Sequence, residues 1–452
     1  MPSFLWRTRV IVALSVGLTA GQNLHSQATT VANSPIAAQV IGLDEAIRRA
    51  QQNEPAFAAA LADSKSAQID RSLAKAALLP TATYHNQVLY TQPNGQNNQG
   101  GQAGTQPSPI FIANNAVHEY ASQAVLNETL GLRQFAAVRT ADANAARAVA
   151  ELEIARRGLL ATVVGLYYGL ANATRKLTLL EEALQEAKDF SDQTRKRESA
   201  REVAHADVLK AQLQQQQRQR DLMDAKVAAD RARLELGVLL FPDPRTAYET
   251  ILPGSPRAVP TREEINAAAS AGSPEMKSAL ASLKVSQADV LTAKAAYLPD
   301  LGLNFAYGID APQFAKHGPA GVNNLGYSIG ATVDIPVWDW FSTQKRVKQS
   351  QIRRDVARVA LSATQRRFIA TLDEAYAEAS VAHEQLELLD LTVRTASESL
   401  RLTRLRYTAG EATALEVVDA QNSLITAQTS QADGVSRYES ALANLQLLTG
   451  TL

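Results

Sequence analysis

Several features that usually point to a function are missing from this sequence. Its 452 residues include no cysteine, and 45 lysines and arginines balance 45 aspartates and glutamates. The absence of cysteine excludes disulfide frameworks, thiol chemistry and cysteine-ligated metal sites. It also excludes the lipid-modified cysteine that anchors some bacterial envelope proteins. A net charge of zero does not suggest nucleic acid or any other strongly charged partner.

Long apolar runs are missing as well. A helix that crosses a bilayer needs about 20 apolar residues, and no segment reaches that length. The apolar run 10–18 follows two arginines and precedes possible cleavage sites after Ala20 or Ala28, which is the pattern of a secretory signal peptide. We therefore predict that the mature chain is exported and that it does not enter a membrane as helices.

No catalytic constellation is present. The histidines are scattered, at positions 25, 85, 118, 205, 317 and 383. None forms a His-x-x-x-His ligand pair, His383-Glu384 lacks the second histidine of a zinc-protease motif, and there is no phosphate-binding glycine loop. We predict that the chain is not an enzyme and needs no metal or cofactor.

The most informative stretch is 406–421, which reads as a hairpin between two long helices. Gly410 is placed to end the first helix in the left-handed conformation. Thr413 and Glu416 form a capping-box pattern ahead of an apolar run. Glu416 and Asp419 are three residues apart, so both carboxylates project from one face of the second helix.

This hairpin has a weaker copy at 197–212, which lies 209 residues earlier. The motif Ala-Lys-Ala-Ala-x-Leu-Pro also occurs twice, ending at Pro80 and at Pro299, and we expect each proline to end a helix. These pairs predict two tandem repeats of roughly 210 residues. The repeats differ in length because the first carries the Gly/Gln/Asn-rich loop 92–109.

The predicted division assigns each part of the chain to one unit. It consists of a signal peptide (1–28), an N-terminal linker (29–42), a first repeat (43–240) with a strand pair at 81–128 and a hairpin tip near 200, a proline-rich connector (241–260), and a second repeat (261–450) with a strand pair at 300–338 and a tip near 410. Within the first helix, 43–79, we expect a break near Glu54 because Pro55 follows.

After each of these prolines the pattern changes to a period of two. In the second repeat, large apolar residues alternate with small or polar ones over 301–307 and again over 325–335. Two runs of about ten such residues are typical of transmembrane barrel strands. Trp338 and Trp340 follow, as expected of an aromatic belt at a membrane interface. The alternative is a soluble β-hairpin with one solvent-exposed face.

The remaining segments favour very long helices. Residues 159–184 keep apolar side chains at alternating spacings of four and three, and every position 209 residues later is also apolar. Such a seam predicts coiled-coil packing. We expect a helix from about 140 to 199, with return helices at 203–239 and 412–448 that run antiparallel to their partners. A periplasmic coiled-coil scaffold without a pore would explain these helices, but not the strand pairs or the signal peptide.

Taken together, the segments predict an α+β membrane protein. Four tilted strands cannot close a barrel, and lipid does not tolerate an open sheet edge. Other chains must therefore complete the barrel, with eight, twelve or sixteen strands in total.

The chain resembles the TolC-like outer membrane efflux protein family over nearly all of its mature length. The resemblance rests on Leu-Asp-Glu-Ala-Ile at 43–47, both Ala-Lys-Ala-Ala-x-Leu-Pro sites, Asp-Ile-Pro-Val-Trp at 334–338, and the motif at 406–421. It implies a homotrimer with a twelve-stranded barrel in the outer membrane of a Gram-negative bacterium and a helical tunnel across the periplasm. Members are exit ducts for tripartite efflux or type I secretion, and they dock on a periplasmic adaptor that serves an inner-membrane pump.

The resemblance also assigns roles to residues at the tips. Glu416 and Asp419 match acidic positions of the periplasmic pore constriction, although both could simply complement a helix dipole. The corresponding residues of the first repeat are Asp207 and Lys210. Tyr407 matches a tip tyrosine that bonds an acid of the neighbouring hairpin, for which Asp207 is the matching position.

Two features of the tips depart from the family pattern. Ala412 stands where some relatives have a basic residue, which weakens the expectation of a tightly latched closed state. The pairs Ala200-Arg201 and Ala409-Gly410 match the adaptor-docking tips. Because Arg201 replaces a glycine, we expect the first turn to differ from the second or to dock more weakly.

Overall fold

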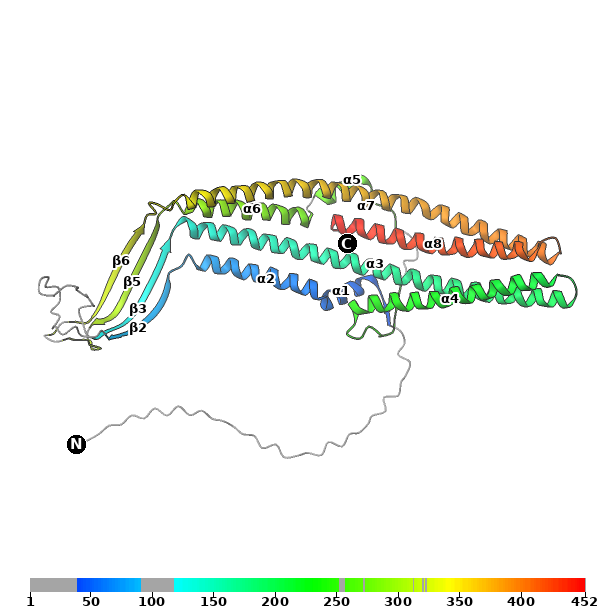
Figure 1. Ribbon diagram of the computed structural model, residues 1–452, viewed down its shortest axis with the longest axis horizontal. Helices are drawn as coiled ribbons and strands as arrows, with labels where there is room; N and C mark the ends of the chain where they lie inside the picture. Colours follow the sequence, from blue (N-terminus) through cyan, green and yellow to red (C-terminus); the bar gives the residue numbers. More distant parts are fainter. Residues whose placement is uncertain are drawn as a thin grey trace, which may run out of the picture.

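The molecule is elongated, with a β-sheet at one end and long helices running from it to the other (Figure 1). The computed structural model describes residues 39–90, 118–251, 257–270, 273–311, 313–318, 321 and 323–451. The predicted signal peptide, 1–28, and the loop 92–109 lie outside these described residues.

The sheet has four antiparallel strands in the order β2-β3-β5-β6. The strands are β2 (Thr81–Tyr90), β3 (His118–Leu130), β5 (Asp300–Ala311) and β6 (Leu325–Asp334). Both predicted strand pairs are confirmed. The pairing of β3 with β5 joins the two halves of the chain into one sheet, which the sequence did not predict.

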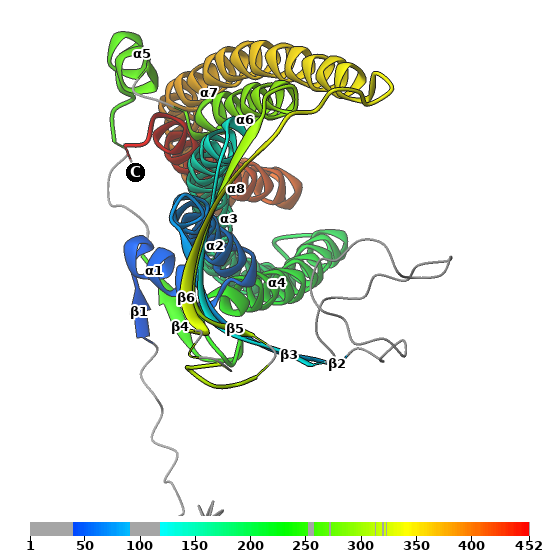
Figure 2. The same ribbon diagram turned by 90° about the vertical axis from the view of Figure 1, so that its left-hand side faces the viewer.

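Apolar side chains on this sheet are left exposed. Phe305 pairs with Ile329, and Tyr307 pairs with Tyr327. Their exposed fractions range from 37% for Phe305 to 74% for Ile329. The described helices continue from the ends of the strands and do not lie across the sheet (Figure 1), and seen from the sheet end the four strands lie side by side (Figure 2). The apolar face therefore needs a cover that these helices do not supply.

The helices account for most of the length of the molecule. They are α1 (Leu43–Asn53), α2 (Pro55–Ala76), α3 (Leu132–Ser199), α4 (His205–Leu240), α5 (Arg262–Ser270), α6 (Pro274–Ala295), α7 (Ser342–Thr408) and α8 (Ala414–Thr449). At 1.5 Å per residue, α3 and α7 are each about 100 Å long. Among the described residues, no helix combines the length and the apolar character that a bilayer crossing requires.

The predicted helix boundaries largely hold. The break at Glu54 is confirmed, since α1 ends before this residue and α2 begins with the next one, Pro55. The start of α3 near 140 is wrong: the helix begins at Leu132, because residues 132–140 contain no proline or glycine to interrupt it. The order helix, strand, strand, long helix, shorter helix occurs twice along the chain.

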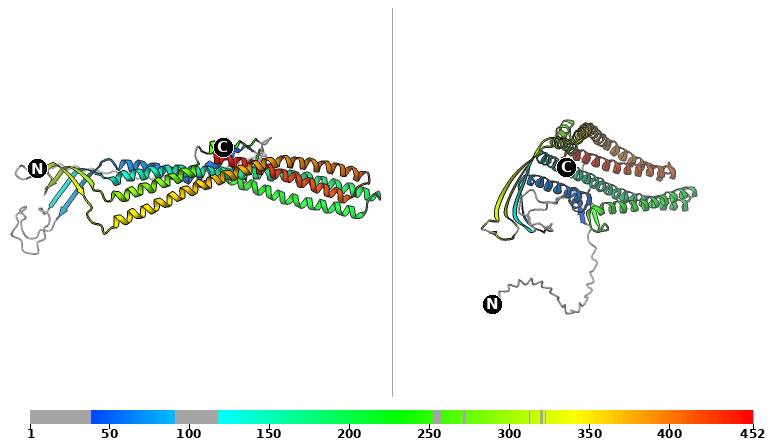
Figure 3. Two further views of the ribbon diagram at one scale, coloured as in Figure 1. Left: turned by 90° about the horizontal axis from the view of Figure 1, so that it is seen from above. Right: turned by 60° about the vertical axis from the view of Figure 1, so that its left-hand side comes forward.

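The predicted apolar seam lies where the helices pack. The long helix of each half lies beside its return helix, α3 with α4 and α7 with α8 (Figure 3). The most buried seam residues are Leu159, Val163, Leu170 and Leu184 on α3, and Leu372, Ala379 and Ala382 on α7. Burial of these side chains supplies the main stabilising term for helices of this length.

A second, small sheet lies midway along the molecule. β1 (Gln39–Ile41) pairs in parallel with β4 (Tyr248–Thr250). The Tyr167 hydroxyl, on α3, donates to the Ile41 carbonyl at 3.0 Å and accepts from the Ile251 N–H at 2.9 Å. The predicted linker 29–42 and connector 241–260 thus contain strands, which are too short to show a two-residue pattern in the sequence.

Candidate functional site

The two helical hairpins end in turns with the same backbone conformation. Gly410 has a φ of 80° and Arg201 a φ of 66°, both in the left-handed region. In each turn, the next residue donates its N–H to a carbonyl of the last helical turn, at 2.8 and 2.9 Å. The prediction for Gly410 is confirmed. The expectation that Arg201 changes the turn is wrong, because these hydrogen bonds hold an arginine in a conformation that costs about 1 kcal/mol.

The capping box at the start of α8 is present as predicted. The Glu416 N–H donates to the Thr413 hydroxyl at 3.3 Å, and the Thr413 N–H donates to a Glu416 carboxylate oxygen at 3.1 Å. Arg406 lies 3.4 Å from the same carboxylate. The hydrogen bond from the Thr413 backbone is the main reason that the pKa of Glu416 is lowered. Glu416 is thus engaged in holding the turn.

Asp419 has a different environment, although it lies on the same helix. Its side chain is exposed and has no hydrogen-bond or ion-pair partner among the described residues, whereas Val418 and Ala420 beside it are buried. In the first hairpin, Asp207 is half-buried and Lys210 exposed. Only the second hairpin therefore presents a free carboxylate at this position.

The predicted link between Tyr407 and Asp207 is absent from this conformation. Tyr407 is 3% exposed, and its hydroxyl donates to Thr194 on α3 at 3.3 Å. Its ring lies 5.3 Å from that of Phe190, also on α3. The link fails because Tyr407 lies on the face of α7 that meets α3, whereas Asp207 lies in the first turn of α4.

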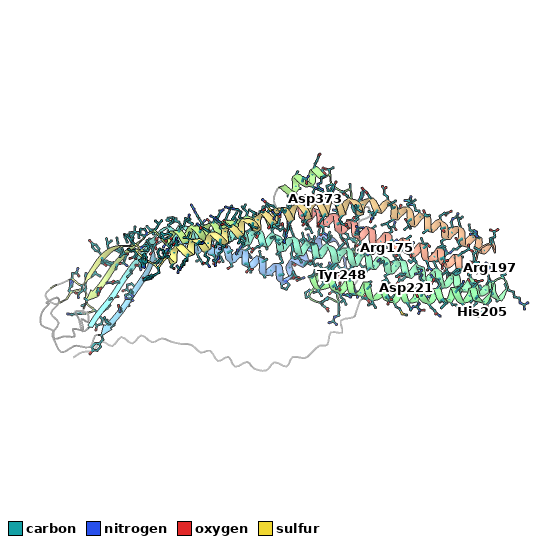
Figure 4. The ribbon with its side chains drawn as sticks, turned by 45° about the horizontal axis from the view of Figure 1, so that its top comes forward. Arg175, Arg197, His205, Asp221, Tyr248 and Asp373 are labelled. Atoms are coloured by element: carbon teal, nitrogen blue, oxygen red, sulfur yellow. The ribbon has the colours of Figure 1, made fainter. Side chains whose placement is uncertain are left out.

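Arg197, which we did not single out from the sequence, completes this contact between the hairpins. Its guanidinium donates to the Tyr407 carbonyl at 2.6 Å and lies 4.8 Å from the centre of the Tyr407 ring. A second nitrogen bonds Glu202 at 2.9 Å. Figure 4 places Arg197 at the tip of the molecule, with His205. Arg197 of the first hairpin thus places a positive charge at the tips, where Ala412 of the second hairpin provides none.

A buried carboxylate lies farther from the tips. Glu439, on α8, is 1% exposed and accepts a hydrogen bond from the Tyr168 hydroxyl, on α3, at 3.2 Å. Arg257, from the connector, lies 3.6 Å from the same oxygen. Burial of Tyr168 is the main reason that its pKa is raised to about 12, and the nearby charge of Glu439 is the second. The sequence gave no sign of this contact, because Glu439 occupies a helical position that could equally face solvent.

The two tryptophans lie where the sheet meets the helices, between β6 and α7. Trp338 is 64% exposed and Trp340 79% exposed. Their ring centres are 5.7 Å apart, and Phe341 contacts Trp338 in the same edge-on manner at 5.3 Å. The rings therefore pack on one another at the surface.

Among the described residues, no group of histidines and carboxylates is arranged to hold a metal ion.

The sequence is similar to outer membrane and secretion proteins of known identity. Residues 267–451 match the family described as outer membrane efflux protein. Outer membrane protein OprJ of Pseudomonas aeruginosa is 24% identical over 304 residues, which are 64% of this chain and 61% of OprJ. The chain thus spans less than two thirds of OprJ. The alkaline protease secretion protein AprF of the same organism is 22% identical over 423 residues, covering 91% of this chain and 85% of AprF.

The fold agrees with these relatives. The crystal structure of the outer membrane protein VceC from Vibrio cholerae superposes with a TM-score of 0.76, at 18% identity, and covers 90% of this chain and 96% of VceC. Residues 267–451 thus match the outer membrane efflux protein family, and the chain has a fold similar to that of an outer membrane protein of known structure.

Proposed function

We propose that this protein is the outer membrane channel of a tripartite efflux or type I secretion system. It is a passive exit duct, and a partner pump drives the transport. The observation that carries this proposal is the exposed apolar face of a four-stranded sheet, continuous with helices about 100 Å long. A sheet of this kind fits lipid, and helices of this length fit a passage across the periplasm.

A homotrimer completes the barrel. Within one chain, β2 and β6 are the open edges of the sheet. An open edge leaves backbone groups without partners, which lipid does not allow. Three copies that pair β6 with the next β2 form twelve strands, and each copy carries two tandem repeats of one helix–strand–helix unit. Trp338 and Trp340 then lie at the periplasmic interface of the outer membrane.

The hairpin tips form the opposite end of the duct. The tip pairs Ala200-Arg201 and Ala409-Gly410 are exposed. Their turns have the same backbone, so both present a similar shape to a periplasmic adaptor. That adaptor connects the duct to an inner-membrane pump. The contacts of Tyr407 with Arg197 and Thr194 join the two hairpins at this end, which supports a gate here in which Tyr407 is linked to α3.

Purification of the full chain tests the proposed function. We expect a heat-modifiable trimer in the outer membrane fraction that produces single-channel currents in a planar bilayer. A soluble monomer without conductance would contradict the proposal and favour a periplasmic coiled-coil scaffold.

Asp419→Ala is expected to weaken block of the channel by multivalent cations. Three copies place three Asp419 carboxylates around the constriction, and none of them has a partner among the described residues of its own chain. A ring of unpaired carboxylates attracts cations into a narrow pore. We expect the blocking concentration to rise roughly tenfold, which corresponds to a loss of about 1.4 kcal/mol in cation binding. Single-channel recording with a trivalent cation measures this effect.

The matched control for this variant is Asp419→Glu, which retains the charge and should retain the block. Glu416→Gln should change the block less than Asp419→Ala, because Glu416 is engaged in the capping box. Unchanged block in Asp419→Ala would assign this residue to the helix dipole alone.

A further inference from the structure

The segment between β6 and α7 carries exposed rings, and the first turns of α7 carry positive charge that has no ion-pair partner among the described residues. We call Trp338, Trp340, Phe341, Lys345 and Arg346 the junction patch. We propose that the junction patch binds the headgroup of an anionic phospholipid. This inference rests on the proposed function, since it needs the sheet to lie in a membrane.

The backbone holds the rings of the patch outward at an energetic cost. Trp340 and Phe341 have φ values of 55° and 60°, in a region that bulky residues rarely occupy. The Asp339 carboxylate accepts the Thr343 N–H at 2.7 Å and so caps α7 just after this strained segment. Strain of this kind persists where the surroundings impose it, and it gathers at binding sites.

A hollow lies beside the rings at the start of α7. It has a volume of about 490 Å³ and is lined by Asp339, Trp340, Ser342, Lys345, Arg346 and Gln349. Lys345 and Arg346 are exposed and form no ion pair among the described residues. The one acid, Asp339, is directed to the Thr343 backbone. The hollow therefore offers two cations without ion-pair partners among the described residues, next to the Trp340 ring, which suits a phosphate joined to acyl chains.

The charge of the surrounding helix supports the same ligand. Residues 342–354 contain five lysines and arginines and no acid, in a chain whose net charge is zero. The corresponding start of α3 has no tryptophan, and there Arg133 lies 3.9 Å from Asp300. The combination of rings and free cations thus occurs at one junction only among the described residues.

A neighbouring copy of the chain is a poorer occupant. If β6 pairs with β2 of a second copy, residues 77–79 of that copy arrive beside the patch. This segment is Ala-Leu-Leu, and the closest charged residue before it is Lys75. It brings no carboxylate to pair with Lys345 or Arg346, whereas an anionic headgroup does.

Tryptophan fluorescence tests the proposal directly, because Trp338 and Trp340 are the only tryptophans after the predicted signal peptide. The purified trimer in neutral detergent is titrated with brominated phosphatidylglycerol and, separately, with brominated phosphatidylcholine. We expect half-maximal quenching at about tenfold lower phosphatidylglycerol concentration. The double variant Lys345→Gln/Arg346→Gln should lose this preference. The variant Arg366→Gln/Arg367→Gln, with the same charge change farther along α7, should keep it.

Each other outcome would overturn the lipid site in its own way. Equal quenching by both lipids, or a preference that survives Lys345→Gln/Arg346→Gln, would mean that Lys345 and Arg346 do not distinguish the two headgroups. No quenching by either lipid would mean that a second copy covers the patch. Prevention of quenching by millimolar inorganic phosphate would point to a free-phosphate site. A trimer that conducts ions and shows any of these results would refute this inference alone, and not the channel.

Discussion

Glu439→Ala is expected to lower the free energy of unfolding by about 3 to 5 kcal/mol, the largest stability effect that we predict. The carboxylate is 1% exposed and joins three separate segments: α8, Tyr168 on α3, and Arg257 in the connector. Its removal leaves the Tyr168 hydroxyl buried without an acceptor and creates a cavity. Both effects destabilise the folded chain. Urea unfolding of the detergent-solubilised protein measures the change.

Two matched variants separate these contributions. Glu439→Gln keeps the shape and an acceptor for Tyr168, so it should cost less than the alanine variant. Asp230→Ala removes an exposed carboxylate at the position 209 residues earlier, and we expect an effect within about 0.5 kcal/mol. If Glu439→Ala is as stable as Asp230→Ala, the buried contact does not stabilise the chain.

Arg197→Ala is expected to raise the conductance of the closed channel several-fold. The guanidinium contributes a charged hydrogen bond to the Tyr407 carbonyl and a cation–π contact with its ring. Together these interactions stabilise the contact between the hairpins by about 2 to 4 kcal/mol. Every 1.4 kcal/mol changes an equilibrium tenfold, so their loss should shift the tips strongly toward the open arrangement. Single-channel recording in the absence of an adaptor measures this shift.

Arg406→Ala is the matched control, because Arg406 occupies the same position in the second hairpin. Among the described residues, its guanidinium reaches only the carbonyl of Glu411 and the carboxylate of Glu416, on its own tip. We expect little change in conductance from this variant. Arg197→Lys should fall between the wild type and Arg197→Ala, since lysine keeps the charge but not the planar donor geometry. A conductance unchanged by Arg197→Ala would remove Arg197 from the gate.

Local sequence was sufficient for one hairpin turn and for several boundaries between elements. Gly410 ends α7, Thr413 and Glu416 cap α8, and Pro55 separates α1 from α2, as predicted. These features depend on backbone preferences and on hydrogen bonds between residues a few positions apart, so a single sequence contains the necessary information. The two-residue alternation of the strands and the apolar seam of the long helices could also be predicted from the sequence, because side-chain periodicity is a local property.

Contacts between distant segments could not be predicted from local sequence. The joining of β3 to β5, the pairing of Tyr407 with Thr194, and the reach of Arg197 across the hairpins all depend on how the long helices lie together. Arg201 shows a different limit, because the local hydrogen bond from the Glu202 N–H to the Arg197 carbonyl outweighed the conformational preference of Arg201.

The sequence by itself thus determined the long helices, the four strands of the main sheet, their order and the kind of protein they build. The tertiary structure decided which side chains meet, because each such contact contributes only a few kcal/mol and forms only after packing has placed its partners. At the tip, this difference changes the residues to test first. Asp419 was singled out from its spacing to Glu416 and from the family resemblance, whereas Arg197 was found only from its contact with Tyr407.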